Sequence, residues 1–300
     1  MILFLTPIGH PDTSKNYSKV MELLQLTTNS ISNQSDRDFK FVIVCNEVPN
    51  IKHDDPNVIY HIVDFEPPKF DRNMPITQAN KDYRVFMRDK GTRLLSGLLH
   101  SLQYEPDYVF LLDCDDWINI NVTQFLNSQN EFPVWFVDKG YVLNYKTKKY
   151  KRKSGMIRYC GSTLAYKTDF LMKLADLKLK VDGSTDQATL LESTSSMFIE
   201  DILGNHARGY YYFRDMGIEP TPLPFRAVTW VVESGENVSR STGGEHGITI
   251  KEDYCKEFGN PLFLNKQKPS SLTAIVREFV GNLKSRLSWY KSTKSDHFFY

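Results

Sequence analysis

The sequence predicts an α/β protein with a mostly parallel central sheet and helices on both faces. The main observation is a set of apolar runs in which apolar and polar residues do not alternate, as is typical of strands buried on both faces. Helix-like segments separate these runs, and this order indicates parallel strands joined by covering helices. The strand-like runs are residues 2–6, 39–45, 58–65 and 108–112.

Two helices are expected between these strands, at residues 17–32 and 91–102, where leucine and valine recur at the spacing of one helical face. The pattern changes after residue 116. There, residues 134–145, 159–166 and 227–232 are strand-like, and residues 186–206 are predicted to form a helix. The second half of the chain is therefore expected to be less regular than the first.

The bulk composition excludes several classes of function. Lys and Arg total 37 and Asp and Glu total 36, so the net charge is +1 and we expect no nucleic-acid partner. The four cysteines form no CxxC pair, which favours free, mostly buried thiols in a reducing compartment and thus a cytoplasmic protein. The apolar residues 1–7 lack a basic flank and are interpreted as a strand rather than a signal peptide. No apolar run is long enough to cross a bilayer.

The strongest functional signal is the acidic cluster at residues 113–116, Asp-Cys-Asp-Asp, which directly follows a predicted buried strand. Ligands of open α/β sheets bind at the carboxyl ends of strands. Carboxylates crowded there repel one another unless a cation neutralises them, and oxygen ligands suit Mg²⁺ or Mn²⁺. Such a metal would stabilise the charge on a leaving nucleoside diphosphate. The alternative interpretation is a solvated acidic turn that caps a following helix.

Residues 107–116 resemble the DxD region of family-two-like GT-A glycosyltransferases. Three further segments follow the same order as in that family. Residues 44–47 (Val-Cys-Asn-Glu) end the second strand, where the family's nucleoside pocket lies. Residues 89–93 (Asp-Lys-Gly-Thr-Arg) resemble a stretch that approaches the nucleotide, and residues 158–166 resemble the strand beneath the donor sugar. The resemblance extends over residues 1–232.

This resemblance implies a GT-A fold, the Rossmann-like fold of nucleotide-diphospho-sugar transferases. It also implies metal-dependent transfer of a sugar, which we interpret as a hexose, from a nucleotide-sugar to a hydroxyl of a glycan or glycolipid acceptor, in polysaccharide or glycan biosynthesis. A UDP-sugar is favoured, with GDP and dTDP as alternatives, and Mn²⁺ or Mg²⁺ is the implied cofactor. The implied nucleotide-binding residues are Pro7, Asn46, Glu47, Asp64, Lys90, Arg93, Asp113 and Cys114, and the implied metal ligands are Asp115, Asp116 and His246.

The family also carries a carboxylate, often in a Glu-Asp pair near a helix start, that serves as catalytic base for the acceptor hydroxyl. Glu200 and Asp201 resemble that pair. Asp186 is the rival, although at a helix N-terminus it could serve only as a cap. The sequence chooses neither between these carboxylates nor between inversion and retention. His206 is interpreted as a cation at a helix C-terminus rather than as a site residue.

One domain is expected over residues 1–265, with a nucleotide-binding half at 1–117 and an acceptor-binding half at 118–265. Residues 270–300 are predicted to form a C-terminal amphipathic helix and tail, whose apolar face we expect to pack against the domain. Peripheral contact with the cytoplasmic face of a membrane is the alternative. The basic run 146–153 is expected to be a solvated hairpin tip, with an anionic membrane or a phosphate-bearing acceptor as its alternative partner.

Two other functions compete with sugar transfer. A sugar-phosphate nucleotidyltransferase would use a similar sheet, but it needs a Gly-rich loop with Arg and Lys after the first strand. Residues 6–11, Thr-Pro-Ile-Gly-His-Pro, lack that loop. A non-catalytic glycan-binding module would bind sugar without binding a nucleotide.

Overall fold

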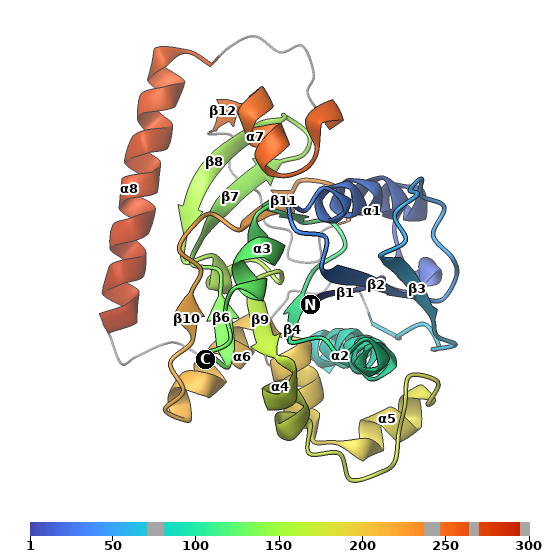
Figure 1. Ribbon diagram of the computed structural model, residues 1–300. Coiled ribbons are helices and arrows are strands. Elements are labelled where there is room, and N and C mark those ends of the chain that lie inside the picture. Colours follow the sequence, from blue (N-terminus) through green and yellow to red (C-terminus); the bar gives the residue numbers. More distant parts are fainter. Residues whose placement is uncertain (71–80, 237–246, 264–269, 295–300) are drawn as a thin grey trace.

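The computed structural model describes residues 1–70, 81–236, 247–263 and 270–294. Within these residues a seven-stranded mixed sheet forms the centre of the molecule, and a five-stranded sheet adjoins it (Figure 1). Helices cover the central sheet on both sides. The predicted α/β class, with helices on both faces of a largely parallel sheet, is confirmed.

The strand order of the central sheet is β10-β6-β9-β4-β1-β2-β3. Strands β1 to β4 run parallel to one another, β9 lies antiparallel between β4 and β6, and β10 is parallel to β6. The strands are β1 (Ile2–Pro7), β2 (Phe39–Cys45), β3 (Val58–Ile62), β4 (Tyr108–Leu111), β6 (Val134–Phe136), β9 (Leu164–Lys167) and β10 (Thr221–Pro222). Because β2 and β3 lie on one side of β1 and β4 on the other, the strand order reverses between β1 and β4.

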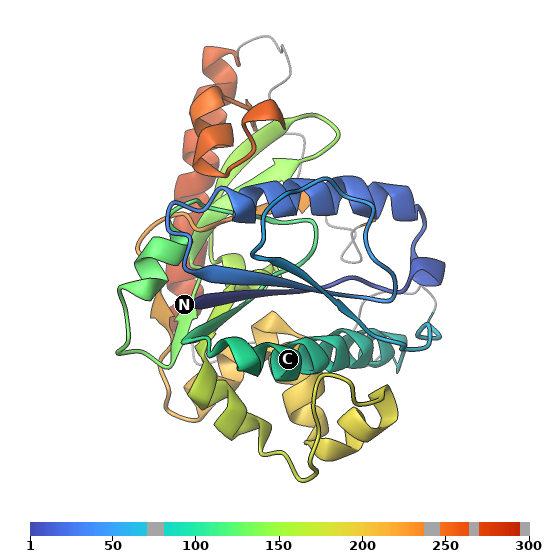
Figure 2. The same ribbon diagram turned by 45° about the vertical axis from the view of Figure 1, so that its right-hand side comes forward.

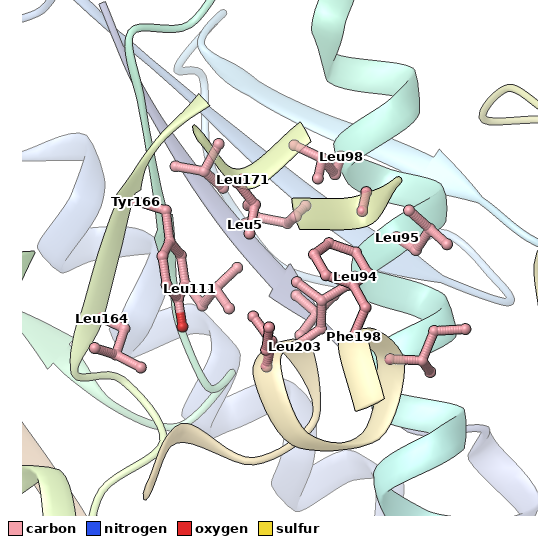
Figure 3. Packing of buried hydrophobic residues seen from close by; sticks show 14 of the residues in the cluster. Leu5, Leu94, Leu95, Leu98, Leu111, Leu164, Tyr166, Leu171, Phe198 and Leu203 are labelled. Carbon is pink, nitrogen blue, oxygen red and sulfur yellow. The ribbon is translucent and has the colours of Figure 1, made fainter. Parts of the chain in front are cut away.

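Helix α1 (Tyr17–Ser32) lies on one face of the central sheet and α2 (Lys81–Ser101) on the other (Figure 2). Side chains of β1 alternate between them, so Leu3 and Leu5 pack in the cluster with α2, whereas Ile2 and Phe4 pack in the cluster with α1. Figure 3 shows the α2 side, where leucines of α2 meet β1, β4 and β9. Burial on both faces explains why these strands are uniformly apolar.

The second sheet has the strand order β12-β8-β7-β11-β5. Its strands are β5 (Trp117–Ile118), β7 (Lys139–Asn144), β8 (Lys149–Ser154), β11 (Val228–Val232) and β12 (Ile248–Thr249). The single strand predicted at 134–145 is therefore two strands, β6 and β7, that belong to different sheets. Likewise, only residues 146–148 of the basic run are a turn, because Lys149 to Ser154 form β8 between β7 and β12.

The helix predicted at 186–206 is wrong as a continuous element. It consists of α5 (Gln187–Ser193), a π-helix (Phe198–Leu203) and the start of α6 (His206–Asp215). The break between the first two lies within the Ser-Thr-rich stretch 193–196, where Thr194 adopts an extended conformation with φ −147° and ψ 176°. Hydroxyl side chains compete with the helical backbone for hydrogen bonds, which explains a break there. The strand predicted at 159–166 is also too long, since β9 begins only at Leu164.

The other helices are α3 (Val122–Asn127), α4 (Thr168–Ala175), α7 (Glu252–Glu257) and α8 (Leu272–Lys294). Helix α8 lies along the outside of the second sheet (Figure 1), packed against β8 and β12. The expectation that its apolar face packs against the domain is wrong, because that face is exposed. Within the described ranges, no helix combines the length and the hydropathy needed to span a bilayer. All four cysteines are free, and Cys45, Cys160 and Cys255 are buried as predicted.

Candidate active site

A cavity of about 260 Å³ opens at the carboxyl ends of β1 and β4. The strand order of the central sheet reverses between these two strands, and this is where open α/β sheets bind ligands. Six of the residues predicted to bind nucleotide or metal line it: Pro7, Lys90, Arg93, Asp113, Cys114 and Asp115. The fold thus gathers these residues from β1, α2 and the segment that follows β4.

The acidic cluster after β4 divides between the cavity and the core. Asp113 and Asp115 line the cavity and are partly exposed, whereas Asp116 is buried behind them. Burial raises the pKa of Asp115 well above its usual range, and the neighbouring Asp116 and Asp113 raise it further. Charge on Asp115 is therefore costly without a compensating cation at the cavity surface.

Asp116 accepts hydrogen bonds on both carboxylate oxygens. Its Oδ2 accepts from Ser162 Oγ at 2.6 Å and from Cys160 Sγ at 3.1 Å, and its Oδ1 accepts from the backbone N–H of Val231 at 3.0 Å. Burial, followed by repulsion from Asp113, raises its pKa to about 7. These bonds tie the loop before β9 and strand β11 to the end of β4. They give Asp116 a structural position, and its role as a metal ligand stays a prediction.

Lys90 of α2 forms an ion pair with Asp113, with 2.5 Å between Nζ and Oδ1. Burial lowers the pKa of Lys90, but the charge of Asp113, the hydrogen bond to it and the charges of Tyr83 and Asp116 together outweigh burial and raise the pKa. Gly161 allows the pair to form, because a Cβ there would lie 2.0 Å from Asp113 Oδ2. Gly161 lies in the segment 158–166, which resembles the family's donor-sugar strand. A side chain at this position would collide with Asp113, so the position requires glycine.

Arg93 is fully buried beside this pair and is held by two hydrogen bonds. Its Nε donates to Asp89 Oδ2 at 3.0 Å, and its Nη1 donates to Asn46 Oδ1 at 2.7 Å. Its Nη2 is buried and has no hydrogen-bond partner among the described residues. A buried guanidinium nitrogen without a partner is costly. Because Arg93 lines the cavity, this nitrogen is a candidate donor to an acceptor oxygen of a ligand.

The remaining predicted nucleotide-binding residues lie further out. Asn46 stands behind Arg93 and also donates from Nδ2 to the backbone oxygens of Val63 and Phe65. Glu47 and Asp64 are exposed and are not among the residues that line the cavity. Asn46 therefore positions Arg93, and direct nucleotide contact by Glu47 or Asp64 stays a prediction.

The Glu200–Asp201 pair lies on the π-helix, which approaches α2 closely at Gly91, where a Cβ would be 2.0 Å from the backbone oxygen of Ile199. Glu200 is buried and accepts from Arg88 Nε at 2.9 Å and Nη2 at 2.7 Å. Asp201 is partly exposed and pairs with Arg208 Nη1 at 2.5 Å. Both carboxylates line a small second cavity.

Three residues of this second cavity, Tyr83, Met87 and Asn205, also line the main cavity. Asp201 therefore lies one layer behind the main cavity. Asp186, in contrast, caps α5: its Oδ1 accepts from Thr189 N at 3.0 Å and its Oδ2 accepts from Thr189 Oγ1 at 2.7 Å. The structure gives Asp186 the capping role, and no described contact supports its role as a base.

The cavity is also lined by residues that the sequence analysis did not assign to the site. The rings of Tyr159 and Trp230 stack with centroids 6.1 Å apart, and both line the cavity. Asn205 and His206 stand nearby at the start of α6, so the interpretation of His206 as a C-terminal cap is wrong. Burial, and then the charge of Lys90, lowers the pKa of His206 to about 4, so the imidazole is neutral at physiological pH.

We call Lys90, Arg93, Asp113 and Asp115 the charged wall, and Tyr159, Trp230, Asn205 and His206 the aromatic wall. The charged wall could be found from the sequence because its residues follow a strand or share one helix. The aromatic wall joins the loop before β9, strand β11 and helix α6. For the aromatic wall, the sequence analysis indicated only the segment around Tyr159, through the similarity of residues 158–166 to the family.

The chemistry of the charged wall fits a divalent metal held largely by a ligand's phosphates. Among the residues that the structure describes, no group of three or more His, Cys, Asp or Glu side chains is arranged to hold a metal ion. His246, the third predicted ligand, lies outside the described residues. Mg²⁺ and similar ions are commonly bound by one or two carboxylates together with phosphate oxygens and water. The carboxylate of Asp115 fits such an arrangement.

No family model and no curated protein match the chain. Among solved structures it is similar to S. aureus TarS 1-349, with 12% identity, a TM-score of 0.37 and coverage of 77% of this chain and 60% of that chain. TarS 1-349 in complex with UDP-GlcNAc gives 13% identity, a TM-score of 0.38 and coverage of 84% and 63%. An active-site mutant of LgtC gives 11% identity, a TM-score of 0.34 and coverage of 77% and 87%.

These structures are of glycosyltransferases, the class that residues 107–116 resemble. The chain spans only 60% and 63% of the two TarS 1-349 structures. With TM-scores below 0.5, the similarities add no argument about function. Any functional conclusion therefore rests on the residues that line the cavity.

Proposed function

We propose that this chain is a metal-dependent glycosyltransferase that moves a sugar, a hexose, from a nucleoside-diphosphate sugar to a hydroxyl of a glycan or glycolipid. We place this reaction in polysaccharide or glycan biosynthesis. The observation that carries the proposal is the charged wall at the carboxyl ends of β1 and β4. There Asp113 and Asp115 meet Lys90 and Arg93 in one cavity.

The charged wall suits a diphosphate in two respects. Lys90 supplies a positive charge and Arg93 a spare N–H donor, and both favour phosphate or nucleobase oxygens. Asp115 supplies a carboxylate whose raised pKa supports the proposal of a cation beside it. A Mn²⁺ or Mg²⁺ ion bound there with the donor would neutralise charge on the leaving diphosphate. We favour UDP as the nucleotide.

The aromatic wall suits the acceptor. Ring faces such as those of Tyr159 and Trp230 pack well against the apolar faces of sugars, and Asn205 and His206 offer polar atoms beside them. The acceptor hydroxyl oxygen would form a bond to the anomeric carbon as the bond from that carbon to the phosphate oxygen breaks. The hydroxyl proton must pass to a base.

We propose Asp201 as this base, because its cavity shares Tyr83 and Asn205 with the main cavity. Asp201 is itself paired with Arg208, but it is partly exposed. Glu200 is buried and held by Arg88, and Asp186 lines neither cavity. If Asp201 is the base, Asp201→Asn should lower kcat about 100-fold or more without changing UDP affinity. Asp186→Asn is the matched control and should leave kcat within about twofold. The reverse ranking of these two variants would assign the base to Asp186.

The proposal is tested by calorimetric titration of the full chain with UDP in the presence of Mn²⁺ and, separately, of EDTA. We expect UDP binding that Mn²⁺ strengthens, and we expect Asp115→Asn to remove that Mn²⁺ dependence. Asp253→Asn, which changes an exposed carboxylate on α7, should behave as the unmodified chain does. A thermal-shift screen of nucleotide-sugars with Mn²⁺ then identifies the donor.

Three results would overturn the proposed function. Sugar binding without any nucleotide binding would show a glycan-binding module. Sugar transfer that is unaffected both by EDTA and by Asp115→Asn would remove the metal from the mechanism. Formation of a nucleotide-sugar from a sugar phosphate and a nucleoside triphosphate would instead show a nucleotidyltransferase.

A further inference from the structure

Helix α8 turns its polar side towards the protein. Glu278 is buried, accepts from the backbone N–H of Arg152 at 3.0 Å and forms an ion pair with the Arg152 guanidinium at 3.6 Å. Ser285 Oγ accepts from the backbone N–H of Ser154 at 3.3 Å and donates to its backbone oxygen at the same distance. Trp289 is the one large apolar side chain of this side, with Arg158 stacked 4.9 Å from its ring. These contacts attach α8 to β8.

The opposite side of α8 is apolar and exposed. Its side chains are between 42% and 76% exposed, although they recur at the spacing of one helical face. We call these residues the outer face of α8: Leu272, Ile275, Val276, Phe279, Val280, Leu283 and Leu287. A surface helix ordinarily buries its apolar face and exposes its polar one, so α8 has the inverse arrangement. A contiguous exposed apolar surface of this kind marks an interaction site.

Charge indicates what covers this face. Arg277, Lys284 and Lys291 are exposed and follow one another at intervals of seven residues, about two helical turns, so they form a row along one border of the outer face. Arg286, seven residues after Phe279, is exposed near the other edge of the outer face. The only acidic residue of α8 is Glu278, which is buried against Arg152. The outer face is therefore apolar in the middle and basic at its borders.

This pattern favours an anionic lipid surface over a second copy of the chain. Two α8 helices packed through their outer faces would bring basic borders together with no acidic side chain of α8 to pair with them, which is unfavourable. A bilayer surface with anionic headgroups receives apolar side chains among its acyl chains and attracts Lys and Arg beside them. We propose that α8 binds the protein to an anionic membrane surface through this outer face.

The experiment is sedimentation of the full chain with vesicles of phosphatidylcholine alone and of phosphatidylcholine with phosphatidylglycerol. We expect binding to the anionic vesicles at least about tenfold tighter than to the neutral ones, and weakening as salt is raised. Lys284→Glu combined with Lys291→Glu should weaken binding at least about tenfold, since each charge near the surface contributes. Phe279→Ser combined with Leu283→Ser should do so as well.

Two control variants match these changes elsewhere on the surface. Leu179→Ser changes a leucine that is 43% exposed, close to the 48% of Leu283, and Lys180→Glu reverses an exposed charge near α5. Both should bind anionic vesicles as the unmodified chain does. All of the changed side chains are exposed, so melting temperatures should stay unchanged and confirm that each variant folds. The assay requires no donor, metal or acceptor, so it is independent of the proposed enzyme activity.

Three results would overturn the proposal. One is absence of binding to anionic vesicles at millimolar lipid. Another is equal binding to neutral vesicles that Lys284→Glu and Lys291→Glu leave unchanged, because charge would then not select the surface. The third is a stable dimer in analytical ultracentrifugation that Leu283→Ser dissociates, because a second copy would then cover the outer face.

Discussion

The charged wall and the aromatic wall of the cavity differ in how their residues are held. On the charged wall, Lys90 and Asp113 hold each other, and Arg93 is bound between Asp89 and Asn46. On the aromatic wall, Tyr159 and Trp230 touch through ring faces, and His206 has a buried Nε2 without a hydrogen-bond partner among the described residues. The first wall is preorganised by mutual bonds, whereas the second offers packing surface. Changes to the first should therefore spread through its network, and changes to the second should stay local.

The largest effect is expected from Gly161→Ala, which acts on the charged wall without removing any of its side chains. The added Cβ would lie 2.0 Å from Asp113 Oδ2, so Asp113 and its partner Lys90 must move. Overpacking of this kind costs about 1–3 kcal/mol, so we expect UDP affinity to fall about 100-fold in calorimetry. Gly281→Ala on α8, where a Cβ meets nothing within 4 Å, should leave affinity unchanged. Unaltered UDP binding by Gly161→Ala would show that the ligand does not depend on this wall.

The second-largest loss of UDP affinity is expected from Lys90→Met. This variant leaves the carboxylate of Asp113 without its cation, and we expect about 30-fold weaker UDP binding and a lower melting temperature, because charged hydrogen bonds contribute about 1.5–3 kcal/mol. Lys90→Arg keeps the charge and should recover most of both losses. Stronger Mn²⁺-dependent binding in Lys90→Met would contradict this, because it would mean that the ammonium competes with the metal for Asp113.

The same contrast explains how much of the site could be predicted from sequence. Asp113 follows a buried apolar strand and Lys90 lies on an amphipathic segment, so local patterns place both at one edge of a parallel sheet. Tyr159 and Trp230 lie in a loop and in β11, and they meet only because β11 pairs with β7 and β5 in a second sheet. Pairing between distant strands leaves no local pattern. The aromatic wall could therefore be identified only from the structure.

The sequence also does not distinguish the roles of neighbouring residues of the same type. Asp115 and Asp116 are chemically identical, yet one lines the cavity and the other accepts three hydrogen bonds in the core. The backbone path after β4 decides this, and composition carries no trace of it. Helix α8 is a similar case. The spacing of its apolar residues correctly predicts that they share one face, but it does not predict whether that face is buried or exposed.

A moderate effect on stability is expected from the neutral imidazole of the aromatic wall. His206 has a pKa of about 4 in the folded chain, against about 6.5 when unfolded. The unfolded chain therefore binds more protons between these pH values, and the free energy of unfolding falls as pH drops through them. The unmodified chain should lose free energy of unfolding between pH 7.5 and pH 5. Allowing for partial exposure, we expect His206→Gln to make this loss smaller by about 1–2 kcal/mol, as measured by urea unfolding.

The matched variant for this measurement is His61→Gln. His61 is buried between β3 and α2, its Nε2 is 2.8 Å from Ser96 Oγ, and burial lowers its pKa to about 4 as well. It should change the pH dependence of unfolding in the same direction while leaving UDP binding intact. If His206→Gln keeps the full pH dependence of the unmodified chain, His206 is not the neutral, buried group that the structure indicates.

The smallest effect is expected from Trp230→Leu on the aromatic wall. Loss of an aromatic contact costs about 0.5–1.5 kcal/mol beyond buried area, so we expect the KM for the acceptor to rise about threefold to tenfold, with kcat and UDP affinity unchanged. Tyr159→Leu should act similarly, because the two rings form one surface. Phe132→Leu, at an exposed ring outside the cavity, is the control. A fall in UDP affinity equal to the rise in acceptor KM would place these rings against the nucleotide, and the division of the cavity into two walls would then be wrong.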